Sequence, residues 1–205
     1  MSFDTTAVNS GVHNGVVKQL PKLLGKDLLP LACRHHVAEL VLKHCFELKE
    51  GDSKSNNLDC FKCFRSTFNE NESLRQNQQY RSAMDVPEMV KLIAPWREEM
   101  IEFCESQLTA KHPRDDFREL LELVMIFLGA VPPGGVKFKK AGSISRARWM
   151  SRAIYCFKAW MFQISMQTFS SGLITHFGKM CLFISQCYIR YWYRLRDAVN
   201  CIIFP

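Results

Sequence analysis

Apolar residues recur at three- and four-residue steps along most of the second half of the chain, which is typical of amphipathic helices. Pro87 and Pro95 bracket a short helical piece. The same steps predict longer helices over residues 96–108, 115–131, 144–166 and 172–196. Residues 124–131 are apolar on all sides, so this end of the second long helix is expected to be buried before Pro132-Pro133-Gly134-Gly135 stops it.

The first third of the chain has a different pattern. Residues 1–6 form a short β-compatible stretch that leads into small polar residues, which predicts a strand followed by a loop. Apolar spacing then predicts a helix over residues 31–48, with Pro30 at its first position. Polar residues at 51–57 and 69–81 indicate breaks between elements. Together these patterns predict a mainly α fold with a small α/β part at the N-terminus.

Composition narrows the class of protein. The chain has 205 residues, of which 47% are apolar and 23% charged, and these values are typical of a globular protein. Residues 1–10 do not resemble a signal peptide, and the nine cysteines are irregularly spaced, so we expect free thiols in the nucleus or cytoplasm rather than secretion. The uncharged window 159–175 contains several polar side chains, so no transmembrane segment is expected.

Charge is unevenly distributed along the chain. The net charge is +1 over residues 1–85, −4 over 86–130 and +10 over 131–205. A last third this basic suggests a polyanionic partner, either nucleic acid or an anionic membrane surface. The alternative is a solvated helical surface whose charge is neutralised by the acidic middle stretch.

One run of seven cations without an intervening acid stands out in the basic third. Its members are Lys137, Lys139, Lys140, Arg146, Arg148, Arg152 and Lys158. Such a run predicts weak, sequence-independent contacts to nucleic-acid phosphates. Arg148 and Arg152 are expected to share one face of the predicted helix, because they are one turn apart.

Three short motifs occur in a fixed order. In Phe3-Asp4-Thr5-Thr6 an aspartate follows the predicted strand, where it can hold a divalent metal or simply cap a turn. In Cys33-Arg34-His35-His36, Cys33 and His36 are three residues apart and are expected to share a helix face. The third motif is Arg146-Ala147-Arg148-Trp149, whose tryptophan, by composition alone, is more typical of core packing.

In this order, the motifs resemble the middle of hAT-like DNA transposases, which use an RNase H-like fold. Residues 31–40, 141–157 and 181–192 are also similar to an uncharacterised animal family of transposon-derived proteins. The resemblance implies that Asp4 corresponds to the second catalytic aspartate, Cys33 and His36 to the conserved pair, and Arg148 with Trp149 to the insertion motif. It also implies three parts, namely a partial RNase H-like core, a polar connecting segment and a helical insertion-like domain, over residues 1–60, 61–84 and 85–205.

The resemblance is incomplete at the catalytic positions. The family has a first aspartate upstream of the residue that corresponds to Asp4 and a final glutamate beyond the Arg-Trp region, and neither has a counterpart here. Two metals held by three carboxylates need all three, so we expect a catalytically incomplete, transposase-derived protein. No cofactor is expected, with Mg or Mn needed only if the missing carboxylates are supplied. The expected partner is DNA, bound weakly, and a homo-oligomer is a second candidate.

Two alternatives remain open from the sequence. Cys60 and Cys63 can join Cys33 and His36 in a Cys3His zinc set, but two small apolar residues in a helix give the same pattern, so no metal site is expected. The other function is a helical protein-interaction or membrane-surface module with no nucleic-acid role. Salt-dependent DNA affinity would favour the first function, and strong liposome binding the second.

Overall fold

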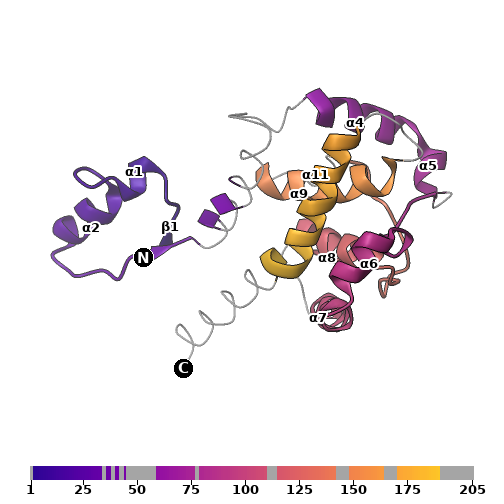
Figure 1. Cartoon of the computed structure of the whole chain (residues 1–205). Coiled ribbons are helices and arrows are strands. Elements are labelled where there is room, and N and C mark those ends of the chain that lie inside the picture. The colour runs from indigo at the N-terminus through magenta and orange to yellow at the C-terminus, as the bar shows by residue number, and fades with distance from the viewer. Residues whose placement is uncertain are drawn as a thin grey trace. The chain divides into compact units, whose positions relative to one another are not determined.

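The fold is mainly helical, as the sequence predicts, and it divides into two units (Figure 1). The computed structural model describes residues 2–33, 36–37, 40–41, 44, 59–76, 79–109, 115–141, 148–163 and 170–189. One unit comprises Met1–His44 with Arg190–Pro205, and the other comprises Cys45–Ile189. The boundary at residue 44 therefore precedes the predicted one at residue 60.

The N-terminal unit contains two short parallel strands joined by two helices. Strand β1 (Ser2–Phe3) pairs with β2 (Leu31–Ala32), and α1 (Ala7–Ser10) and α2 (Val16–Leu24) lie between them in sequence. The first strand is confirmed. The predicted helical start at residues 30 and 31 is wrong, because Leu31–Ala32 pairs with a strand about 30 positions away that local periodicity does not reveal. Helical backbone is found at the described positions from His36 to His44.

The second unit is built from helices alone among its described residues. They are α4 (Asp59–Glu70), α5 (Glu72–Gln76), the 3-10 turn η1 (Ala83–Asp85), α6 (Pro87–Ile93), α7 (Arg97–Thr109), α8 (Asp115–Phe127), α9 (Arg148–Met161), α11 (Ser171–Phe183) and the π turn η2 (Ile184–Tyr188). The helices predicted after residue 86 are confirmed over these spans. The ends predicted at 144–147, 164–166 and 190–196 lie outside the described residues, as does the polar break at 51–57.

The segment predicted as a polar connection, residues 61–84, is part of the helical unit instead. Helix α4 buries Phe61, Phe64 and Phe68, which lie at steps of three and four and so face the same side. The Phe61 ring stacks on Phe177 of α11 with 5.6 Å between centroids, and the Phe64 and Phe68 rings stack at 5.1 Å. The polar residues between the three phenylalanines make the stretch resemble a loop in sequence, so the helix is not predicted there.

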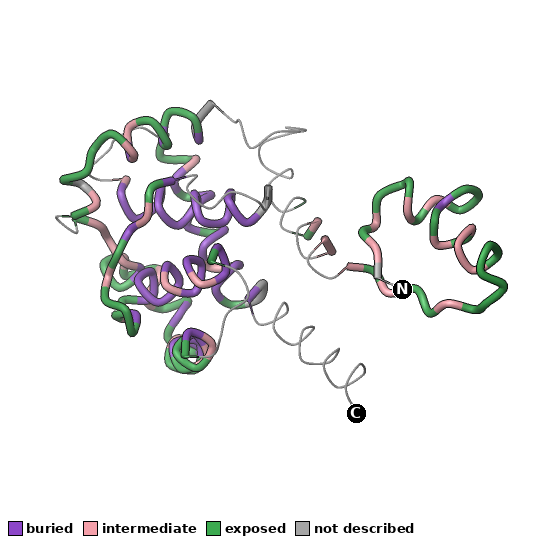
Figure 2. The backbone as a smooth tube through the Cα atoms, turned by 180° about the vertical axis from the view of Figure 1, so that it is seen from behind, coloured by how far each residue is buried: buried purple, intermediate pink, exposed green. Residues whose placement is uncertain are grey.

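Helix α9 lies at the centre of the unit and packs against both α8 and α11 (Figure 1). Every described side chain from Met150 to Met161 is buried, and the tube in Figure 2 is continuously buried there. The end of α8 is also buried, from Val124 to Leu128, as the sequence predicts. Val131, which was expected to continue this segment, is 67% exposed, because the helix has already ended at Phe127.

The C-terminal end of α9 is closed by a segment from before α6. The Arg81 backbone N–H donates to the carbonyl of Met161 (2.9 Å), and its Nε donates to the carbonyl of Trp160 (3.0 Å). The guanidinium also lies 4.1 Å from the Trp160 ring centroid, a cation–π distance. These contacts satisfy carbonyls that the last turn of a helix leaves without intrahelical partners.

Helix α11 lies close against Trp160 of α9 at Gly178. A Cβ atom at this position would lie 2.9 Å from the Trp160 Nε1 atom and 2.6 Å from the Met89 Cε atom. The Met89 methyl group can move, but the Trp160 ring is fully enclosed and packs against Phe127 at 5.0 Å. Gly178 therefore sets the spacing of these helices.

We expect Gly178→Ala to lower the free energy of unfolding by about 1–3 kcal/mol, because the added methyl overpacks the contact with Trp160. Gly172→Ala is the matched control on the same helix. Its Cβ meets nothing within 4 Å, so alanine should be neutral or stabilise by up to about 1 kcal/mol through helix propensity. Urea denaturation of the three proteins checks this, and equal midpoints would contradict the close approach.

Candidate nucleic-acid interface

The lysine-rich loop between α8 and α9 is the part of the predicted cationic run that reaches the surface. A turn closes it at one end, where the Gly135 N–H donates to the Pro132 carbonyl (2.8 Å) and Gly135 has φ of 76°, a conformation that favours glycine. Lys137 and Lys140 are exposed, and Lys139 is half-buried. Phe138, between Lys137 and Lys139, and Ala141, after Lys140, are buried. The loop thus exposes Lys137 and Lys140 and holds its apolar side chains inward.

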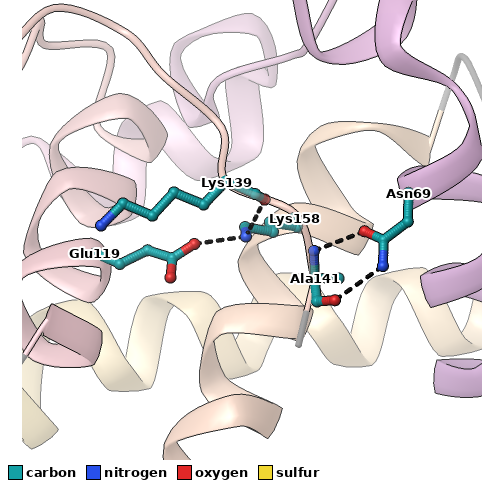
Figure 3. Close-up of polar contacts among 5 residues, drawn as sticks. All are labelled: Asn69, Glu119, Lys139, Ala141 and Lys158. Carbon is teal, nitrogen blue, oxygen red and sulfur yellow. Dashed lines mark hydrogen bonds and ion pairs between the residues drawn. The ribbon is translucent and has the colours of Figure 1, made fainter. Parts of the chain in front are cut away.

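Three contacts hold this loop on the helical core. The Phe138 ring packs edge-on against Phe162 at 4.8 Å and against Tyr80 at 5.2 Å. The Asn69 side chain of α4 bonds both backbone groups of Ala141, since its Nδ2 donates to the carbonyl (2.9 Å) and its Oδ1 accepts from the N–H (2.7 Å) (Figure 3). Burying these backbone groups without partners would be costly. Asn69 therefore fixes the loop's second end.

The third contact comes from Lys158 of α9. Its Nζ donates to the carbonyl of Lys139 (2.7 Å) and to Oε1 of Glu119 on α8 (2.5 Å), as Figure 3 shows. The Lys158 side chain is fully buried, and Glu119 is 4% exposed. Burial lowers the pKa of the Lys158 ammonium, and the charge and hydrogen bond of Glu119 oppose this change. The buried ammonium of Lys158 thus needs the carboxylate of Glu119 beside it to remain charged in the core.

This arrangement corrects two of the predicted phosphate contacts. Arg152 is 1% exposed and Lys158 is 0% exposed, so neither side chain can reach a phosphate in this structure. The physical reason is that α9 is enclosed on all sides instead of presenting a polar face to solvent. Arg146 lies outside the described residues, and so do the side chains of Arg148 and Trp149.

The acidic middle stretch neutralises part of the basic third, which was the alternative explanation of the charge pattern. Glu119 does so inside the core, whereas a solvated surface had been expected. A second acid of α8, Glu122, is half-buried, and this burial raises its pKa, while the nearby charges of Lys139, Arg118 and Lys137 act in the opposite direction. The carboxylate of Glu122 thus already attracts the charges of Lys137 and Lys139 within the protein.

The contacts of Asp4 are those of a turn cap. Its Oδ1 accepts hydrogen bonds from the Thr6 N–H (3.0 Å), the Thr6 hydroxyl (2.5 Å) and the Asn9 amide (2.7 Å) just before α1. The same hydrogen bonds, led by the Thr6 hydroxyl, lower the pKa of Asp4. Among the described residues there is no group of three His, Cys, Asp or Glu side chains that could hold a metal ion. What the geometry shows of Asp4 is therefore the capping role.

The predicted Cys-x-x-His pair does not share a helix face. The Cys33 N–H donates to the carbonyl of Phe3 (2.6 Å) and so extends the pairing of the two strands. Its own carbonyl accepts from the Val37 N–H (3.1 Å), and Cys33 itself is not helical, whereas His36 is. Cys33 is a free thiol, as is the exposed Cys63 of α4, and the side chain of Cys60 lies outside the described residues.

Sequence reasoning missed Asn69, which bonds the loop directly, and Glu119, which pairs with the lysine that bonds the loop, Lys158. A signal for Glu119 was present, because Leu123 and Ile126 follow it at i+4 and i+7 and place it on an apolar face of the helix. A buried acid requires a cation, and Lys158 supplies it from 39 positions away. No comparable signal exists for Asn69, whose partner is 72 positions away.

We expect Lys158→Met to destabilise the protein by about 3–5 kcal/mol, because it leaves Glu119 charged and buried without its partner. Lys158→Met/Glu119→Leu should recover most of this loss, since an apolar pair of similar volume removes both charges. Lys179→Met, at an exposed position of α11, is the control and should change little. A double-mutant cycle by chemical denaturation measures the coupling. Additive losses would mean that Glu119 and Lys158 act independently.

Comparison with known proteins adds no family to this description. No protein-family model matches the chain, no curated protein matches its sequence, and no solved structure matches its fold. The resemblance to hAT-like transposases stays an implication of the three motifs, and the function has to be argued from the residues themselves.

Proposed function

We propose that the chain associates weakly, and without sequence preference, with nucleic acid through the loop lysines Lys137, Lys139 and Lys140. The observation that carries the proposal is the exposure of Lys137 and Lys140, with the half-buried Lys139 between them, on an anchored loop. Lys137 and Lys140 are exposed, while Phe138 and Ala141, which alternate with them, are held in the core. A transposase-derived protein, as the motifs imply, is a natural setting for such contacts.

The anchors make the loop better suited to this role than a flexible tail of the same charge. Asn69 and Lys158 bond its backbone at Ala141 and Lys139, so the positions of the lysine Cα atoms are set before a ligand arrives. Less conformational entropy is then lost on binding. Contacts to phosphates position a protein on nucleic acid but carry no sequence information, which agrees with the absence of preference in the proposal.

The acidic groups of the protein limit the strength and direction of binding. Glu122 lies near Lys137 and Lys139 and competes with a phosphate for their charge. Helix α7 exposes four acids, Glu98, Glu99, Glu102 and Glu105, which repel a polyanion from that helix. About three phosphate contacts correspond to a slope of log affinity against log salt near −2.7 on duplex DNA. Strand cleavage forms no part of the proposal.

We expect Lys137→Gln/Lys140→Gln to flatten this salt slope by about 1.8 units, because two phosphate contacts are lost. Affinity for two unrelated duplexes should fall to the same extent. The control is Lys91→Gln/Lys179→Gln, which removes the same charge from exposed positions on α6 and α11. Fluorescence anisotropy at several salt concentrations measures both. If the two double variants behave alike, net charge rather than the loop carries the binding, and the proposal fails.

A further inference from the structure

Exposed large apolar residues are concentrated in the N-terminal unit. Within residues 3–33 they are Val8, Val12, Val16, Leu23, Leu24 and Leu29, and their exposed fractions range from 41% to 81%. Among residues 3–33, whose burial the structure describes, Gly15 is the one residue that is buried. Figure 2 shows the contrast with the extensively buried helices of the other unit. Six exposed apolar side chains in so short a stretch exceed the scattered ones that are normal on a protein surface.

Part of this surface is a single apolar face of helix α2. Val16, Leu20, Leu23 and Leu24 lie at positions i, i+4, i+7 and i+8, which fall on one side of a helix. None of the residues of α2 is buried, and Leu23 is 81% exposed. The apolar face that would normally drive packing is therefore uncovered.

The opposite side of α2 carries only positive charge. Lys18 and Lys22 are exposed and stand one turn apart, and Lys26 follows the left-handed cap at Gly25. The helix contains no acid, and the nearest one in sequence is Asp27, beside Lys26. An apolar face backed by lysines is the pattern of helices that lie in the plane of a lipid interface, where the cations meet anionic headgroups.

We propose that the N-terminal unit docks on an anionic lipid surface, with the apolar face of α2 inserted at the headgroup boundary and Lys18, Lys22 and Lys26 near the lipid phosphates. The positive charge of these lysines favours an anionic lipid surface over an uncharged apolar groove of another protein. Among the described residues, none of the helices could span a membrane. The site is separate from the loop lysines Lys137 to Lys140, and the two proposals stand or fall independently.

The test is flotation of the full-length chain with vesicles of phosphatidylcholine alone and of phosphatidylcholine with phosphatidylserine in equal parts. We expect binding to the anionic vesicles that weakens as salt rises. Lys18→Gln/Lys22→Gln should weaken it roughly 25-fold, about fivefold for each lysine near the surface. Lys91→Gln/Lys179→Gln is the charge-matched control from the other unit and should leave most of the binding intact.

A second variant pair tests the apolar face. Leu23→Glu/Leu24→Glu should lower partitioning by more than about 100-fold, because two leucines can no longer insert and two negative charges are added. Leu92→Glu/Val131→Glu adds the same charge at exposed apolar positions of the helical unit and should have a much smaller effect. Lys137→Gln/Lys140→Gln should keep vesicle binding even where it loses DNA binding.

Three outcomes would overturn the proposal. The first is equal binding to both kinds of vesicle, which would remove the role of the lysines. The second is an equal loss in the α2 variants and their matched controls, which would make the effect one of net charge. The third is a dimer in size-exclusion chromatography that dissociates in Leu23→Glu/Leu24→Glu without any binding of the wild type to vesicles. That result would identify the face as an interface between copies of the chain.

Discussion

The enclosure of α9 on every side is the constraint on which the arrangement of the helical unit depends. A helix with no solvent-facing side cannot send Lys158 to water, so the ammonium needs a carboxylate within the core, and Glu119 of α8 supplies it. The remaining donor capacity of Lys158 holds the Lys139 carbonyl. The burial of one lysine thereby determines where the backbone of the neighbouring lysine-rich loop lies, and so which cations of the basic third reach the surface.

The two units differ in how far their apolar side chains are buried. In the helical unit, α4, α8 and α11 supply aromatic and aliphatic side chains that cover α9, and Gly178 allows the helices to approach closely enough to exclude water. Among the described residues of the N-terminal unit, two strands of two residues each, the four residues of α1 and the nine of α2 provide too little material for an interior. Its large apolar side chains, such as Leu23 and Leu24, remain exposed. For this reason we propose that a lipid surface, and not another part of the chain, covers them.

The parts of the fold that the sequence predicts are those whose apolar residues follow one local period. Helices α6, α7 and α8 were expected close to their observed positions, because prolines and aspartates mark their starts. Helix α4 was missed, although Phe61, Phe64 and Phe68 carry the period, because polar residues dominate between them. Strand β2 and the Asn69 contact depend on pairings with distant residues that no local pattern encodes. The burial of Arg152 and Lys158 does not follow from their charge, which by itself predicts exposure to solvent, whereas the apolar residues on all sides of α9 indicate a buried helix.

The most direct measurement of this account is the reactivity of individual lysines toward an amine-acetylating reagent, followed by mass spectrometry. If Lys158 is enclosed with Glu119 beneath an anchored loop, Lys137 and Lys140 should be acetylated rapidly in the folded protein, whereas Lys158 should react only when the protein is unfolded in urea. Burial lowers the pKa of Lys158, and a lowered pKa would make an accessible amine more reactive. Slow acetylation of Lys158 would therefore report its enclosure and not its pKa. Acetylation of Lys158 in the folded protein at the rate of Lys137 and Lys140 would contradict the buried pair and the loop geometry built on it.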